Sequence, residues 1–155
     1  MKKHPLLLLL FCCTLFFSAC SDDDDATPSK EDMLMNKRWQ ITALEVALPI
    51  IGSQDLYEDF EDCEKDNFIE FRANGVVTVD EGATKCDDSN PQQYPGTWTL
   101  EGDVLTIKGA GSSFGLPVND LKLTITQLSG NSLEGEFSQS ISGYEIDGTV
   151  TLKTM

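Results

Sequence analysis

Residues 121–137, LKLTITQLSGNSLEGEF, decide the fold class of this chain. Apolar residues occupy every second position from Leu121 to Ile125, and the same period of two resumes from Leu133 to Phe137. Between the two runs lies Ser129-Gly130-Asn131, which is typical of the short turns that join antiparallel strands, with Gly supplying a positive φ. The stretch therefore predicts a β-hairpin whose strands bury one face and expose the other.

The alternation of this hairpin recurs along the chain and predicts eight strands. Their inward positions, in chain order, are Trp39, Ile41 and Ala43; Ile69 and Phe71; Val77 and Val79; Trp98 and Leu100; Leu105 and Ile107; Leu121, Leu123 and Ile125; Leu133, Gly135, Phe137 and Ile141; and Tyr144, Ile146, Val150 and Leu152. Short turns follow the second, fourth and sixth strands, and long connections follow the first, third and fifth. The short turns are 73–75, 101–103 and 129–131, and the long connections are 44–66, 81–95 and 109–118.

In an up-and-down meander the short turns share one end of the sheet and the long connections share the other. Eight strands that each pair with the next most simply close into a barrel, because closure removes exposed sheet edges. We expect an all-β fold over residues 31–155, an eight-stranded antiparallel up-and-down barrel. Ser29, followed three residues later by Asp32, is typical of a helix start and predicts a short N-terminal helix.

The first twenty residues are a different kind of segment. Lys2 and Lys3 precede a mostly apolar run of twelve residues, Leu6 to Phe17, which is too short for a permanent span and has the layout of a secretory signal. Phe17-Ser18-Ala19-Cys20 resembles the bacterial lipobox, whose cysteine receives a lipid with acyl chains such as palmitate. We expect residues 1–19 to be a lipoprotein signal peptide and Cys20 to be the lipidated N-terminus of the mature protein.

Residues 20–30 then form an acidic tether. Ser21 is followed by four aspartates, and a block of like charges without apolar residues stays solvated. Two interpretations remain open: a plain spacer, and, by resemblance, the export signal that places lipoproteins on the outer face of the outer membrane in one group of Gram-negative bacteria. We favour the second and expect a lipid-anchored outer-membrane protein that faces the cell surface.

The charge of the chain limits its partners. The 155 residues include 26 acidic and 11 basic side chains, for a formal net charge of −15. Without residues 1–19, nine basic side chains face 26 acidic ones, and the net charge is −17. Nucleic-acid binding needs a basic face, so we expect no nucleic-acid partner and a solvated outward surface.

The five cysteines lie in different parts of the chain, and their expected roles differ accordingly. Cys12 and Cys13 leave with the signal peptide and Cys20 is the lipidation site, so only Cys63 and Cys86 remain in a compartment where disulfides persist. Both lie in connections at the long-loop end of the predicted barrel. We expect a bridge between them, which would stabilise the fold by about 3 kcal/mol; two free thiols are the alternative.

Several short motifs occur in an order that resembles a known family. They are Trp39, Cys63-Glu64-Lys65-Asp66-Asn67, Phe71, Gly75, Cys86, Gly96-Thr97-Trp98 and Leu105-Thr106-Ile107. From about Leu34 to Leu152 they resemble the lipocalin-like domain of many bacterial surface lipoproteins, although Lys37 replaces the Gly of the Gly-X-Trp signature of true lipocalins. The resemblance implies a calycin-type barrel and ligand binding, and it does not name the ligand.

Few kinds of catalytic or metal-binding chemistry are available to the mature chain. The only histidine, His4, leaves with the signal peptide, which excludes Ser-His-Asp and Cys-His catalysis and histidine-based metal sites. No Gly-x4-Gly-Lys phosphate loop is present, and at this density of acids pairs of carboxylates arise by chance. We therefore expect no enzymatic activity, no catalytic residue, no cofactor and no metal site.

Residues 55–66, DLYEDFEDCEKD, hold seven acids and one lysine. Clustered carboxylates can bind Ca²⁺, but the spacing matches no EF-hand loop. We favour a solvated acidic face, and weak Ca²⁺ binding is the alternative. Leu56, Tyr57 and Phe60 stand among these acids at helical spacing, so a short helix would lay them across the mouth of the barrel.

The long-loop end is the expected entrance, because ligand sites in barrels lie at their mouths and the N-terminal helix would plug the other end. The aromatic residues expected to ring it are Tyr57, Phe60, Tyr94, Phe114 and Tyr144. The residues expected in the interior are Trp39, Phe71, Trp98 and Phe137. Gly135 and Gly148 mark either a bend in the sheet or room for a ligand, and a barrel packed solid is the alternative.

Two functions follow from this organisation. The first is a membrane-anchored lipoprotein that binds a small apolar or amphipathic molecule at its loop end. The second is a protein-interaction module, similar to a proteinase inhibitor or a subunit of a surface nutrient-capture complex, that uses the same loops against an envelope protein and holds no small molecule. We favour the first.

Overall fold

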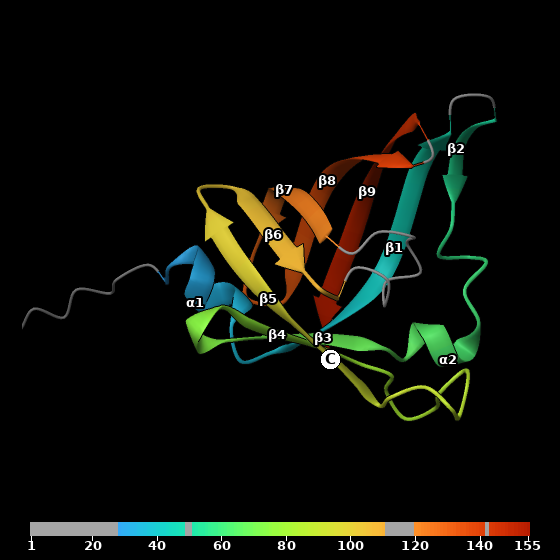
Figure 1. Cartoon of the computed structure of the whole chain (residues 1–155). Coiled ribbons are helices and arrows are strands. Elements are labelled where there is room, and N and C mark those ends of the chain that lie inside the picture. The colour runs from blue at the N-terminus through green and yellow to red at the C-terminus, as the bar shows by residue number, and fades with distance from the viewer. Residues whose placement is uncertain (1–27, 49–50, 111–119, 142) are drawn as a thin grey trace, which may run out of the picture.

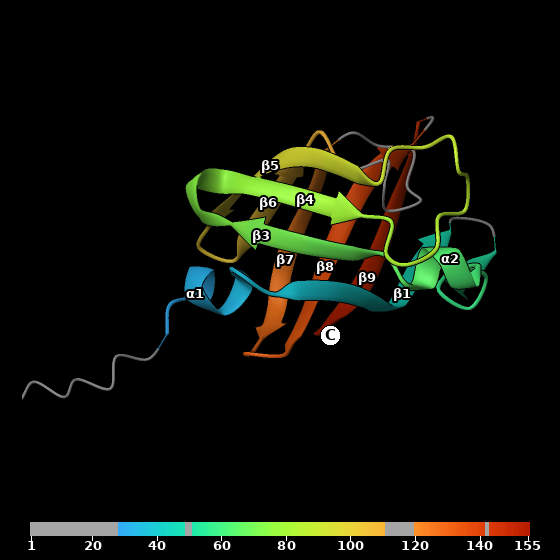
Figure 2. The same ribbon diagram turned by 90° about the horizontal axis from the view of Figure 1, so that it is seen from below.

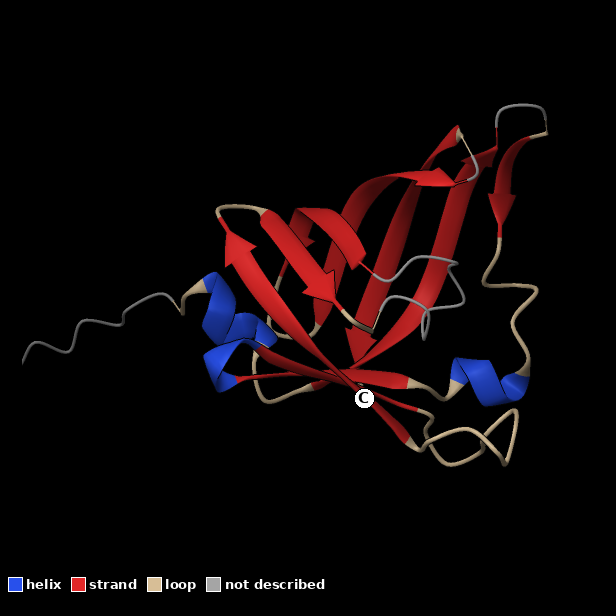
Figure 3. Cartoon of the chain, in the orientation of Figure 1, coloured by secondary structure: helices blue, strands red, loops and turns tan. Residues whose placement is uncertain are grey.

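The computed structural model describes residues 28–48, 51–110, 120–141 and 143–155. Its helices are α1 (Lys30–Leu34) and α2 (Asp62–Lys65), with one 3₁₀ turn, η1 (Ala73–Gly75). Its strands are β1 (Arg38–Leu48), β2 (Gly52–Asp55), β3 (Phe68–Arg72), β4 (Val76–Asp80), β5 (Gln93–Glu101), β6 (Val104–Lys108), β7 (Asp120–Leu128), β8 (Ser132–Ile141) and β9 (Tyr144–Thr154). Figure 1 and Figure 3 show the strands wrapped around a common interior, with α1 and α2 far apart.

Eight of these strands form a closed antiparallel meander. The order is β1-β3-β4-β5-β6-β7-β8-β9, and β9 returns to pair with β1. The β1–β9 pairing is long, from Trp39 opposite Thr154 to Ala47 opposite Asp147, whereas β1 and β3 pair only at Arg38 and Trp39. The structure therefore confirms the predicted eight-stranded up-and-down barrel, with a short seam between β1 and β3.

Strand β2 is a ninth strand that the sequence did not predict. It pairs with β1 between Glu45 and Leu48, so β1 runs well past its expected end. All four residues of β2 are exposed. Because neither of its faces is buried, β2 carries no alternation of apolar and polar residues that a period-two pattern could detect.

A bulge changes which residues of β1 face inward. The pairing with β9 shifts between Ile41 and Ala43. Beyond it Leu44 and Val46 are buried, and Ala43 pairs with Thr151 on the opposite face. The prediction of an inward Ala43 was wrong, because one extra residue reverses the faces of an alternating strand.

The two ends of the barrel differ as the loop lengths predicted. The β3–β4 turn lies at the same end as α1, and α2 lies beside the 81–92 connection at the other end (Figure 2). Gly75 and Gly102 adopt the expected positive φ in their turns, at 70° and 64°. Gly130 does not; there the hydroxyl of Ser129 accepts the N–H of Ser132 at 3.1 Å and holds the turn.

Helix α1 closes the short-turn end. The N–H of Asp32 donates to the hydroxyl of Ser29 at 3.1 Å, and the N–H of Ser29 donates back to the Asp32 carboxylate at 3.2 Å. Leu34, at the end of the helix, is fully buried. Its carbonyl accepts the indole N–H of Trp39 at 2.8 Å, which fixes the helix against the first barrel strand.

The core is one continuous cluster to which α1 and all eight barrel strands contribute. Its buried apolar residues are Leu34, Trp39, Leu44, Val46, Ile69, Phe71, Val77, Val79, Trp98, Leu105, Ile107, Ala110, Leu121, Leu123, Ile125, Leu133, Phe137, Val150 and Leu152. The four residues predicted for the interior are all among them. The barrel is thus filled by its own side chains along most of its length.

Candidate functional site

The long-loop end brings only part of the predicted aromatic ring together. Tyr57 and Phe60 pack on each other, with ring centroids 5.7 Å apart. Both are half-buried against the core, as is Tyr94 on β5. Tyr144 is 59% exposed, and Phe114 lies outside the described residues. The half-buried aromatic residues of this end are therefore the Tyr57–Phe60 pair and, on β5, Tyr94.

The Tyr57–Phe60 pair belongs to a turn rather than to the expected helix. The N–H of Leu56 donates to the Leu44 carbonyl at 2.8 Å, and the N–H of Tyr57 donates to the Asp55 carboxylate at 3.0 Å. The ammonium group of Lys65, on α2, lies 5.4 Å from the centre of the Tyr57 ring. These contacts hold the turn beside β1, where β1 no longer pairs with β3.

A disulfide joins the two long connections at this end. Cys63 and Cys86 are bonded, with their Cα atoms 5.3 Å apart, so the structure contains the predicted bridge. The Asp66 carboxylate adds a second link, accepting the N–H groups of Ala83 at 3.1 Å and Thr84 at 3.0 Å. Helix α2 and the 81–92 connection are therefore one rigid unit.

Asp80 anchors this unit to the barrel. Its side chain is only 8% exposed, and it accepts hydrogen bonds from Gln93 at 2.7 Å, Gln92 at 2.8 Å and the Gly82 N–H at 3.0 Å. Burial by itself raises the pKa of Asp80, but these three donors outweigh it and hold the pKa below its ordinary value. Asp80 stays charged and serves as a structural acceptor.

Tyr94 is held neutral at the same end. Burial raises the pKa of its phenol, and the nearby Glu81 carboxylate raises it further. A phenol in this state can donate a hydrogen bond and offer an aromatic face, and it cannot serve as a base near neutral pH.

The interior of the barrel leaves little room. Phe71 and Trp98 meet edge to face at 5.4 Å, and the indole N–H of Trp98 donates to the Arg72 carbonyl at 3.0 Å. Between the strands lies an apolar cavity of about 20 Å³, close to the size of one water molecule. Its lining residues are Ile41, Ile69, Phe71, Leu105, Ile107, Leu121, Leu123, Leu133, Val150 and Leu152.

The two inward glycines do not leave room for a ligand. A Cβ on Gly135 would lie 2.6 Å from Cγ of Leu123, and one on Gly148 would overlap the ring of Phe137. Neighbouring side chains already fill the space that each missing Cβ leaves. The interpretation of these glycines as ligand space was wrong; they allow Leu123 and Phe137 to pack across the strands.

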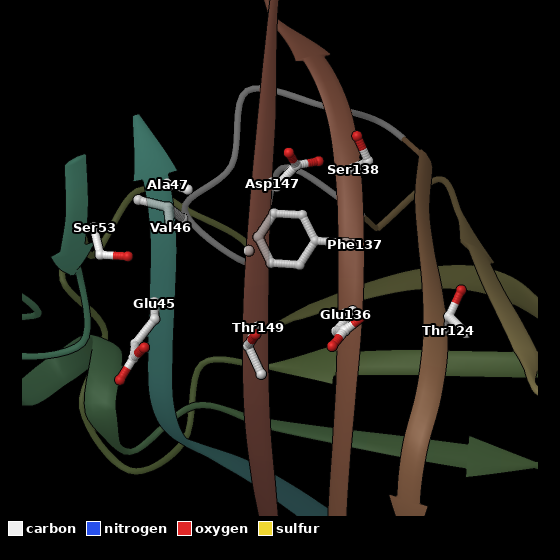
Figure 4. Close-up of a pocket in the computed structure, with 11 residues that line it drawn as sticks. Glu45, Val46, Ala47, Ser53, Thr124, Glu136, Phe137, Ser138, Asp147 and Thr149 are labelled. Atoms are coloured by element: carbon white, nitrogen blue, oxygen red, sulfur yellow. The ribbon is translucent and has the colours of Figure 1, made fainter. Parts of the chain in front are cut away.

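A polar hollow of about 430 Å³ that was not predicted from the sequence lies elsewhere, on the outer face of the barrel. Its lining residues are Glu45, Val46, Ala47, Ser53, Thr124, Glu136, Phe137, Ser138, Asp147, Gly148 and Thr149. Most of these alternate with core residues of β1, β9, β8 and β7, so their side chains point away from the interior. Figure 4 shows the hollow spread across these strands, with β2 at one side.

Among the described residues, one group of three Cys and acidic side chains is compact enough to suggest a metal site. It comprises Glu61, Cys63 and Cys86. Both sulfur atoms are committed to the disulfide, so they are not thiolate ligands. The seven acids of residues 55–66 do not form a further such group within the part of the chain that the structure describes.

Comparison with known families and structures fits this geometry. Residues 35–135 match the model of the lipocalin-like domain. The chain belongs to this family. The lipocalin-like fold is generally a binding fold without enzymatic activity.

Solved structures are similar to this lipocalin-like chain in fold. A lipocalin-like protein from Bacteroides uniformis ATCC 8492 is 17% identical, with 79% of this chain and 99% of that chain covered and a TM-score of 0.50. An uncharacterized protein from Bacteroides eggerthii DSM 20697 is 12% identical over 77% and 98% of the two chains, with a TM-score of 0.45. No curated protein matches the chain significantly.

Both helices in the described part of the chain are short. Neither α1 nor α2 has the length or the apolar character to cross a bilayer. The predicted signal peptide, the lipidation site Cys20 and residues 20–27 of the acidic tether lie outside the described residues. The end of the predicted tether overlaps the helix, since Ser29 caps α1 and Lys30 is its first residue.

Proposed function

We propose that this protein is an envelope lipoprotein, anchored through a lipid on Cys20, whose lipocalin-like barrel binds a small apolar or amphipathic molecule at the long-loop end. The observation that carries the proposal is the set of half-buried aromatic side chains at the long-loop end, Tyr57, Phe60 and Tyr94, each of which packs against the core. Half-buried aromatic rings provide apolar contact area at a low cost in conformational entropy.

The cavity size limits how such a ligand would be held. An interior cavity of about 20 Å³ cannot enclose an organic molecule, because ligand pockets have volumes of about 300–1,000 Å³. The proposed ligand therefore lies across the mouth, against Tyr57 and Phe60, and its polar end remains in water. Shallow binding of this kind favours amphipathic over fully apolar molecules.

The position of α1 supports a particular orientation on the membrane. The tether enters the fold at α1, where Lys30 pairs with Asp103 in the β5–β6 turn. Nine residues lie between Cys20 and Lys30, and the ten Cα-to-Cα steps that they span reach at most about 35 Å. A lipid on Cys20 would therefore hold the short-turn end toward the membrane and direct Tyr57, Phe60 and the disulfide away from it.

The packed interior also favours a second candidate, a protein-interaction module. The disulfide and the Asp66 and Asp80 hydrogen bonds cross-link the loop end, and a preorganised surface suits recognition of another protein. In this case the same end of the barrel would contact an envelope protein, and no small molecule would be retained.

Native mass spectrometry of the full chain, extracted in a nonionic detergent, distinguishes the two. We expect an added mass from a copurified small molecule, and we expect it to be lost in the double variant Tyr57→Ala/Phe60→Ala. Exposed Tyr144→Ala is the matched aromatic control and should retain the added mass. An unliganded wild-type chain that captures an envelope protein through the same two residues would replace the first proposal with the second.

A further inference from the structure

The outer-face hollow has an ordered lining that follows from strand register. One row of directly opposed residues crosses four strands, Glu45 on β1, Thr149 on β9, Glu136 on β8 and Thr124 on β7. A second row lies two residues farther along each strand, toward the long-loop end. It contains Ser53 on β2, Ala47 on β1, Asp147 on β9 and Ser138 on β8. The hollow is thus lined by carboxylates that alternate with hydroxyl and methyl groups.

Three carboxylates on three different strands dominate the charge of this lining. Glu45, Glu136 and Asp147 are exposed, and none of them has an ion-pair partner among the described residues, whose two ion pairs lie elsewhere. No Lys or Arg is among the described residues that line the hollow. A ligand that enters it therefore meets a negative potential inside a concave surface, which favours a cation.

The spacing of the carboxylates selects an extended cation over a compact one. Glu45 and Glu136 are two strands apart, about 10 Å between their backbones, and Asp147 lies about 8 Å from each, since neighbouring strands are about 4.8 Å apart. Their oxygen atoms do not gather closely enough to form a metal-binding group within the described residues. A single divalent ion, which needs six or more oxygens within about 2.6 Å, does not fit this arrangement.

We propose that the hollow binds a small linear polyamine, with successive ammonium groups opposite Glu45, Asp147 and Glu136. The volume of about 430 Å³ suits a small organic molecule. The hydroxyl groups of Thr149, Ser138 and Ser53 can accept the remaining ammonium hydrogens. The site lies on the outer face of β1, β9 and β8 and not at the aromatic mouth, so it does not depend on the function proposed above.

Calorimetric titration of the full chain in nonionic detergent with spermidine, at low ionic strength, tests the proposal. We expect binding that weakens with salt, and hydrogen-exchange protection confined to residues 45–47, 136–138 and 147–149. The triple variant Glu45→Gln/Glu136→Gln/Asp147→Asn should bind spermidine about tenfold more weakly. The matched control, Glu58→Gln/Asp59→Asn/Glu101→Gln, removes the same charge from exposed sites outside the hollow and should change the affinity by less than about twofold.

Several outcomes would overturn the proposal. If the two triple variants lose affinity for spermidine equally, the affinity depends only on the net charge of the chain and not on the hollow. Ca²⁺ or sorbitol binding with equal affinity and the same protected residues would assign the hollow to a metal ion or a neutral polyol. If the first triple variant does not fold, hydrogen exchange of the wild-type chain with spermidine tests the proposal by itself. Protection outside the three segments would show that spermidine does not bind in the hollow.

Discussion

The ring of Phe137 on β8 lies over Gly148, its directly opposed partner on β9. Any Cβ at position 148 would overlap that ring and would also lie 2.6 Å from the backbone oxygen of Glu45 on β1. The glycine thus lets three neighbouring strands approach closely while a large aromatic side chain fills the interior. This relationship explains how the barrel is packed nearly solid at the end where a ligand was expected to enter.

Substitution of this glycine should therefore be costly. We expect Gly148→Ala to lower the free energy of unfolding by about 1–3 kcal/mol, because the ring and the backbone oxygen must both move to admit a methyl group. The measurement is the midpoint of urea unfolding at constant m-value. Gly130→Ala is the control, since a Cβ there meets only the Lys37 ammonium group at 4.0 Å. Equal stability of the two variants would contradict the packing described here.

Asp80 should make the stability of the fold depend on pH in the acid range. Its hydrogen bonds lower the pKa of the folded state, so the carboxylate contributes stability that is complete above its unfolded pKa of about 3.9. That stability is lost as pH falls through the lower, folded pKa. We expect Asp80→Asn to cost about 1–3 kcal/mol at pH 6, and the difference from wild type to shrink below about pH 4.

Denaturant unfolding at pH 6, 4 and 2.5 measures the Asp80 effect. Exposed Asp59→Asn is the matched control and should show no comparable loss at pH 6. A constant difference between Asp80→Asn and wild type at all three pH values would mean that charge at Asp80 does not stabilise the fold.

The barrel could be predicted because the apolar residues that alternate along its strands are the residues that the fold buries. In β6 and β7, Leu105, Ile107, Leu121 and Leu123 alternate strictly and are all buried, so the period of two reports the burial directly. The bulge of β1 was missed, because one extra residue leaves no mark in composition and reverses the faces after it. Strand β2 was missed because both of its faces meet solvent.

The candidate sites were less predictable than the fold. The pairing of Cys63 with Cys86 follows from the topology of the meander, which places both connections at one end. Contact between Tyr57 and Phe60 depends on a turn that helical spacing did not describe. The outer hollow depends on register: Glu45 and Glu136 are 91 positions apart, and only the pairing of β1, β9 and β8 brings them into one row.

The disulfide should contribute much of the stability of the loop end. Its cysteines are separated by 23 positions, and closing a loop of this length stabilises a fold by about 3 kcal/mol in the chain-entropy description. We expect the double variant Cys63→Ser/Cys86→Ser to lose about that amount in urea unfolding. Reduction of the wild type should reproduce the loss and leave the variant unchanged. Equal stability of oxidised and reduced wild type would contradict the prediction.

Lipidation of Cys20 can be tested separately from ligand binding. Metabolic labelling with a palmitate analogue should mark the wild-type chain, because a lipobox cysteine receives acyl chains, and Cys20→Ser should remove the label completely. Cys13→Ser, which changes a cysteine of the predicted signal peptide, is the matched control and should keep it. The label is a better measure than membrane association, since a chain that keeps its apolar residues 6–17 can stay membrane-bound without a lipid. Retained label in Cys20→Ser would exclude Cys20 as the anchor.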